Sequence, residues 1–151
     1  MAVTIQGKTV FEGDLDDVLK AIEEGLPKIL TDEQTKMELR ITQQHRDVNE
    51  SQFKPYSEQY AKAKGRYKSG KGAQFSVNRS AVDMTLKGAM LRAITRRVTR
   101  RGANIVGEVY FSNAKEAAKA RGNIERGRQF FGFSEKQWQS IRDKIAALIR
   151  K

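Results

Sequence analysis

Apolar and polar positions repeat with two periods along the chain, and the longer period predicts helices. Apolar residues recur every three or four positions over 15–26, and a second stripe with helical spacing consists of Ile29, Glu33, Met37, Ile41 and Gln44. Such spacing is typical of helices that bury one face. Gly25 and Pro27 interrupt the pattern, so we expect two helices here, with Pro27 in the first turn of the second and Asp14 as N-cap of the first.

The same period returns at the C-terminus and predicts a long amphipathic helix. Ser134 and Gln137 have the spacing of a capping box, in which each side chain bonds the backbone of the other residue. The apolar face that follows consists of Trp138, Ile141, Ile145, Leu148 and Ile149. An aromatic cluster precedes this helix at residues 130–133, and most of it should belong to the core.

Alternation with a period of two predicts two β-hairpins. Residues 3–11 predict a short hairpin that turns at Gly7, and residues 95–111 predict a second that turns at Gly102 and Ala103. A short helix after Gly88 precedes the second hairpin, with Met90, Leu91 and Ile94 directed inward. An alanine-rich helix follows it, capped by Ser112 or Asn113 and ending near Gly122.

These elements predict an α+β fold: an antiparallel sheet with packed helices and a long C-terminal amphipathic helix. The length of 151 residues fits a single domain, residues 1–151. Periodicity fades between 47 and 79, where glycines interrupt a lysine-rich stretch, so we expect a flexible basic loop at about 62–80. No apolar stretch is long enough to span a membrane, and the first 13 residues lack a signal-peptide profile, so we expect a soluble, intracellular chain without membrane contact.

Charge is divided unevenly along the chain. The net charge is +11, yet residues 1–50 carry −5 and the remainder therefore +16. This asymmetry predicts an acidic or nucleic-acid partner, although basic residues on solvated faces explain it equally well. The basic residues that we expect to face a partner or DNA are Lys64, Arg66, Lys68, Lys71, Arg79, Arg96, Arg97, Arg100 and Arg101. On a strand, Arg97 and Arg101 would share one face, and Arg96 and Arg100 the other.

The residues that could carry chemistry do not form a recognisable catalytic or metal-binding set. There is no cysteine, and His45 is the only histidine, which we expect at the surface. Gly65–Gly72 has P-loop spacing, but Gly72 replaces the required hydroxyl residue and no apolar strand precedes the loop. Asp14, Asp16 and Asp17 suit the start of a helix better than a calcium loop. We therefore predict no enzyme activity, no cofactor and no metal site.

Two stretches of the chain are informative when read in order: residues 47–64, which include Phe53, Pro55 and Tyr56, and residues 82–91. They resemble the tailed-phage virion morphogenesis family, the Mu-type G protein-like proteins of the head–tail neck and tail end. The hairpin after Ile94 and the segment 128–133 before a terminal helix extend the similarity to residues 40–149. It depends on order and spacing, because no single motif in it is chemically diagnostic.

The resemblance implies a non-enzymatic, ring-forming protomer that acts as a tail terminator or tail-completion protein in the head–tail neck. The implied partners are identical copies in a ring, expected to be a hexamer, a head-side connector or stopper protein, and the tail tube protein. Genomic DNA, contacted nonspecifically, would be a further partner. The implied location is the virion, and the host cytoplasm during assembly.

A different function fits the same charges: a nonspecific nucleic-acid-binding protein whose basic second part contacts backbone phosphates. Such binding would weaken steeply with salt. The sequence contains no zinc finger, recognition helix or RNA-binding aromatic motif that would add sequence specificity. Ring formation favours the neck protein, whereas a monomer with salt-sensitive DNA binding favours the alternative.

Overall fold

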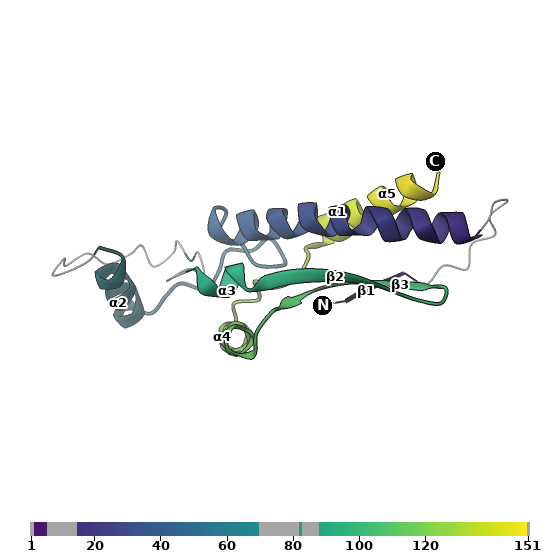
Figure 1. The fold of residues 1–151 in the computed structure, drawn as a ribbon. Helices are drawn as coiled ribbons and strands as arrows, with labels where there is room; N and C mark the ends of the chain where they lie inside the picture. The colour runs from purple at the N-terminus through teal and green to yellow at the C-terminus, as the bar shows by residue number, and fades with distance from the viewer. Residues whose placement is uncertain (1, 6–14, 70–81, 83–87, 151) are drawn as a thin grey trace. The chain divides into compact units, whose positions relative to one another are not determined.

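The structure is a computed structural model that describes residues 2–5, 15–69, 82 and 88–150 (Figure 1). In chain order its elements are β1 (Ala2–Ile5), α1 (Leu15–Thr42), α2 (Glu58–Ser69), α3 (Ala89–Arg92), β2 (Ile94–Arg101), β3 (Asn104–Phe111), α4 (Ala114–Glu125) and α5 (Glu135–Ile149). The predicted α+β class with a C-terminal helix is confirmed. No helix in these described ranges has the length and apolar character needed to cross a membrane.

The chain folds into two compact units. Unit 1 comprises Met1–Lys36, Ile94–Tyr110 and Phe133–Lys151, and unit 2 comprises Met37–Ala93 and Phe111–Gly132. Helix α1 begins in unit 1 and ends in unit 2. That the whole chain is a single functional domain stays a prediction.

A three-stranded sheet with the order β1-β3-β2 forms the base of unit 1. The predicted hairpin over 95–111 is confirmed as β2 and β3, which flank the turn at residues 102 and 103. Strand β1 pairs antiparallel with β3, so that Ala2 lies opposite Glu108 and Ile5 opposite Ile105. The second strand of the predicted N-terminal hairpin, around residues 10 and 11, lies outside the described residues.

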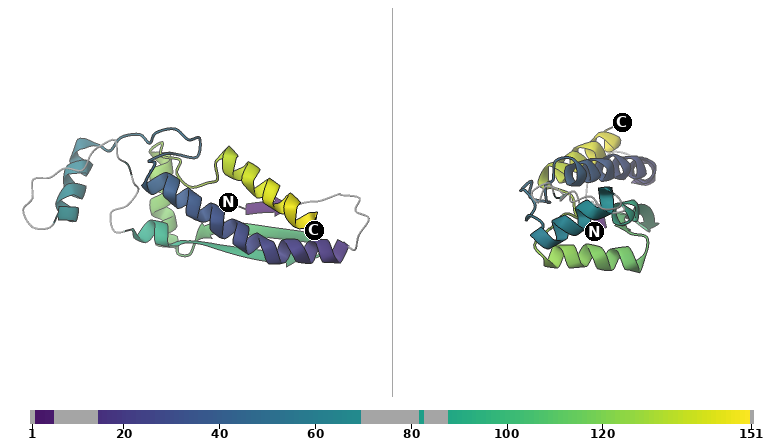
Figure 2. Two further views of the ribbon diagram at one scale, coloured as in Figure 1. Left: turned by 90° about the horizontal axis from the view of Figure 1, so that it is seen from above. Right: turned by 90° about the vertical axis from the view of Figure 1, so that its left-hand side faces the viewer.

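Helices α1 and α5 lie side by side and cover one face of this sheet (Figures 1 and 2). Ile105 and Val109 of β3 are buried beneath them. Gly107 lies between these two residues, and a Cβ atom added there would be 2.9 Å from Leu30 Cδ1 of α1. The absence of a side chain at residue 107 therefore allows α1 to pack close to the central strand.

Helix α1 is one continuous helix of 28 residues, which corrects the prediction of two helices separated at Gly25 and Pro27. A proline inside a helix removes one backbone hydrogen bond but does not prevent burial of the apolar face on either side. Leu26 and Leu30 are fully buried, and Thr31 Oγ1 donates a hydrogen bond to the Pro27 carbonyl. Gly25 also has a packing role, since its Cα faces the Leu148 side chain of α5.

The C-terminal helix α5 forms as the sequence predicts. Ser134 Oγ accepts from the Gln137 backbone N–H, and both halves of the capping box are present. Ile141 and Ile145 are buried, whereas Trp138 is half-buried and contacts Phe133 edge-on, with ring centroids 5.4 Å apart.

Unit 2 contains the short helix α3, the helix α4 and the aromatic segment before residue 133. Met90 and Leu91 of α3 are buried, as the pattern predicts. The Asn113 side chain caps α4 by accepting from the Glu116 backbone N–H. The helix continues to Glu125, beyond its predicted end near Gly122. A glycine in a helix costs only about 1 kcal/mol, so it does not by itself end one.

Helix α2 corrects part of the predicted flexible loop. Residues 58–69 are helical, so the segment from 62 to 69 is not a loop. The helix buries Ala61 and Lys64 rather than an apolar stripe, which explains why hydrophobic periodicity did not reveal it. Residues 70–80 of the predicted loop lie outside the described part of the chain.

Candidate interaction surface

Strand β2 displays its arginines on both faces, as the alternation predicts. It lies at an edge of the sheet, and all four side chains are exposed: Arg96, Arg97, Arg100 and Arg101. Neighbouring residues of a strand point to opposite faces, so one pair faces α1 and the other faces away from it.

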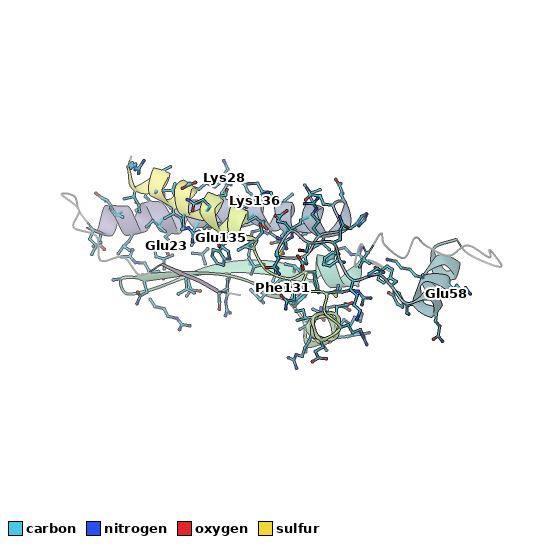
Figure 3. The ribbon with its side chains drawn as sticks, turned by 180° about the vertical axis from the view of Figure 1, so that it is seen from behind. Glu23, Lys28, Glu58, Phe131, Glu135 and Lys136 are labelled. Carbon is cyan, nitrogen blue, oxygen red and sulfur yellow. The ribbon has the colours of Figure 1, made fainter. Side chains whose placement is uncertain are left out.

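The pair that faces α1 is bound to that helix. Arg96 donates to the Gln34 side chain at 3.1 Å, and Arg100 Nη2 lies 2.9 Å from the Asp16 carboxylate. Arg100 Nη1 is also 3.7 Å from Glu23, a residue labelled on α1 in Figure 3. These contacts connect the basic strand to the acidic helix. They also engage Arg96 and Arg100, two of the arginines that the sequence predicts to face a partner.

The opposite face of the sheet is open within unit 1, where no described element covers it (Figure 1). Arg97 forms an ion pair with Glu108 of β3 and lies 5.2 Å from the centre of the Tyr110 ring. The hydrogen bond that Arg97 donates to Glu108 raises the pKa of Arg97 and lowers the pKa of Glu108, so both side chains stay charged at neutral pH. Together with Arg101, these residues form a polar surface that we call the open face: Arg97, Arg101, Glu108 and Tyr110.

The remaining predicted partner-facing residues do not extend this surface. Lys64 is only 2% exposed, and its Nζ donates to the Tyr56 hydroxyl at 3.0 Å. This corrects the expectation that Lys64 faces a partner, since the Tyr56 ring and hydroxyl hold its ammonium inside unit 2. Arg66 and Lys68 belong to α2. Lys71 and Arg79 lie outside the described residues.

The described ranges contain no metal-binding group. Within them no three His, Asp or Glu residues are grouped so that they could hold a metal ion. His45, expected at the surface, is partly buried with a φ of 56°, and its Nδ1 atom has no hydrogen-bond partner in the described structure. Asp16 and Asp17 occupy the first turn of α1, as their helix-start interpretation predicts.

Sequence reasoning missed a cavity in unit 2. Its volume is about 1160 Å³, and it is lined by α4 together with residues 56–60 and 88–90. Lys115, Lys119 and Arg126 line it at positions four and eleven residues apart, which places them on one face of a helix. The helical spacing of these basic residues was the signal in the sequence that could have indicated the site. It is not specific, because helices also carry lysines and arginines on faces that only contact water.

Comparisons of this chain with protein-family models, with curated proteins and with solved structures find no match.

Proposed function

We propose that this chain is a structural virion protein of the head–tail neck of a tailed phage. In this proposal identical copies close into a ring that terminates the tail and joins it to the head connector. The resemblance over residues 40–149 supports the proposal, and so does the geometry of the sheet in unit 1. The protein would act through shape and contact rather than bond-making.

The observation that carries the proposal is the edge strand β2 beside the open face. An edge strand has backbone N–H and C=O groups on its outer side that can pair with another chain. Arginines on both faces of β2 oppose pairing with a second β2, because like charges would meet. They therefore favour a contact between two different surfaces of identical copies, and such head-to-tail contacts generate rings when the rotation closes.

Nonspecific nucleic-acid binding remains the second candidate because of the charge of unit 2. That unit holds 16 Lys and Arg against seven Asp and Glu, a net charge of +9, whereas unit 1 holds a net +2. The β2 arginines favour it less, because Arg97 and Arg100 are already paired with carboxylates. A phosphate would have to compete with those carboxylates.

Two matched double variants of β2 test the proposal. R97Q/R101Q alters the open face, whereas R96Q/R100Q removes the same charge from the face bound to α1. We expect R97Q/R101Q to fold normally and to weaken the association of identical copies at least about tenfold, equivalent to about 1.4 kcal/mol, and so to lower the yield of completed, infectious particles. R96Q/R100Q should instead lower the thermal midpoint of the monomer.

Complementation of a phage that lacks the gene measures the particle yield, and thermal unfolding followed by circular dichroism measures the midpoint of the monomer. Normal particle yield with R97Q/R101Q would contradict a role for the open face in ring contacts. A protein that stays monomeric and binds DNA with an affinity that falls steeply between 50 and 200 mM salt, roughly 10³-fold or more, would favour the nucleic-acid function instead.

A further inference from the structure

The cavity in unit 2 is positively charged, and it takes no part in the proposed ring contact. Four basic residues line it, against one acidic residue: Lys115, Lys119, Arg126 and Arg128 against Glu116. Arg128 is 9% exposed and donates to the backbone carbonyls of Lys54 and Pro55, so its charge is fixed at the wall. Lys115 and Arg126 are exposed and have no ion-pair partner among the described residues. They are free to bind an anion.

Glu116 adds a second, independent indication of a ligand. It is 7% exposed, and Lys119 Nζ lies 2.6 Å from its Oε1. Its Oε2 is buried and has no hydrogen-bond partner in the described structure. A buried carboxylate oxygen without a donor is costly, and native proteins rarely leave one unpaired. Because the terminal torsion of a glutamate is soft, a small rotation would present this oxygen to a donor in the cavity.

The walls of the cavity also provide a place for an apolar side chain. The Tyr60 ring is 43% exposed and packs against Tyr56 with ring centroids 4.9 Å apart. Helix α4 contributes two small residues to the cavity wall, Ala118 and Gly122. Small residues on this face leave the space that larger ones would fill.

We propose that this cavity binds an acidic peptide segment of a partner protein. In an extended peptide, side chains four residues apart lie on the same side and about 13–14 Å apart. Two such carboxylates can reach the long side chains of Lys115 and Arg126, which a helical rise of about 1.5 Å per residue separates by about 16 Å. The peptide backbone supplies N–H donors, and one of them completes Glu116 Oε2. A DNA backbone offers no such donor and would place phosphates beside the glutamate. The inference rests on the proposed function in one respect: that function places the acidic segment on a protein of the adjoining ring.

Fluorescence anisotropy of a labelled hexaglutamate peptide, measured with the full chain at 150 mM salt, tests this site. We expect K115E/R126E to weaken binding at least about tenfold, the equivalent of about 1.4 kcal/mol. R46E/R121E is the matched control, because it reverses the same number of charges and both arginines are exposed in unit 2 but do not line the cavity. It should change the affinity less than about twofold, since screening weakens distant exposed charges. A118W should place a bulky ring on the cavity wall between Lys115 and Arg126 and weaken binding without any change in charge.

Three outcomes would overturn the inference. One is an effect of R46E/R121E as large as that of K115E/R126E, which would reveal general attraction to a basic surface. Another is unchanged binding by A118W in a chain whose circular dichroism is that of the wild type. The third is tighter binding of a six-residue thymidine oligonucleotide in the same cavity. A protein that binds the peptide but is absent from virions would retain this site and lose the proposed function, so the two failures are distinguishable.

Discussion

Glu33 joins α1 to α5 through a carboxylate with no exposed surface. It accepts hydrogen bonds from Lys36 at 2.7 Å, from Ser140 at 2.8 Å and from Lys144 at 3.0 Å. Gln137 Nε2 also donates to the Glu33 backbone carbonyl at 2.8 Å. Burial alone would raise the pKa of Glu33, but the hydrogen bonds outweigh it and lower that pKa below its ordinary value of 4.5.

Because the folded-state pKa of Glu33 is lowered, this residue stabilises the fold above pH 4.5, and the stabilisation is lost as the pH falls through the folded-state pKa. We expect Glu33→Gln to reduce the free energy of unfolding at pH 7 by about 1–3 kcal/mol, because two lysines lose a charged acceptor. Urea unfolding between pH 7 and 3 measures this. The difference from wild type should shrink in acid, and a constant difference would contradict this role. Glu24→Gln, at an exposed site of α1, is the control.

Arg40 has a comparable role in unit 2. It is 3% exposed, and its Nη2 donates to the carbonyls of Phe130 at 2.9 Å and Gly132 at 2.8 Å. Burial lowers the pKa of Arg40, although Glu50 and Asp47 act in the opposite direction. The guanidinium stays protonated at physiological pH because its unperturbed pKa is so high.

We expect Arg40→Ala to destabilise the protein by about 3–5 kcal/mol, because it leaves buried carbonyls without a donor and opens a space in unit 2. Thermal unfolding followed by circular dichroism measures the loss. Arg46→Ala removes an exposed arginine from the same region and should change stability by less than about 0.5 kcal/mol. Equal effects of the two substitutions would show that the carbonyl contacts of Arg40 contribute little.

Single residues were predictable where a local pattern determines their position. The alternation of arginines along β2 follows from strand geometry, and the capping box at Ser134 follows from spacing. Lys64 was not predictable, since its burial depends on a tyrosine eight residues earlier that provides both a ring and a hydroxyl. The cavity residues of α4 were missed for the same reason: residues 56–60 and 88–90 complete the walls.

At the scale of elements, the sequence predicts those that local signals determine. The hairpin of β2 and β3 has a two-residue turn, and α5 has a cap and a regular apolar face, so both were predicted correctly. Helix α1 continues through Pro27 because buried leucines on both sides of the proline outweigh one lost hydrogen bond. The pairing of β1 with β3 joins segments about a hundred residues apart, which periodicity cannot reveal.

Helix α1 therefore leads to a prediction for Pro27. This residue is exposed, and its ring prevents a backbone hydrogen bond within the helix. We expect Pro27→Ala to raise the free energy of unfolding by about 1–3 kcal/mol, because alanine restores the N–H donor and favours the helix. Differential scanning calorimetry measures the change. A lower unfolding temperature would mean that packing in unit 1 requires the proline. Lys28→Ala, at the adjacent exposed position, is the control.

At the scale of the whole molecule, the two units differ in charge and in the surfaces that they offer. Unit 1 is nearly neutral at +2 and presents an edge strand beside an open sheet face. Unit 2 carries +9 and contains the basic cavity. In the proposed function, unit 1 would form the contact between identical copies and unit 2 would contact an acidic partner. A chain with both surfaces can close a ring and dock that ring on a neighbour.

Electron cryomicroscopy of virions from the strain that encodes this chain tests ring formation most directly. We predict that density at the junction of head and tail resolves into a closed ring of identical copies, with β2 of each copy at the contact with the next. Virions in which this ring is missing from the junction, or in which single copies of the chain are bound without contact to one another, would contradict it.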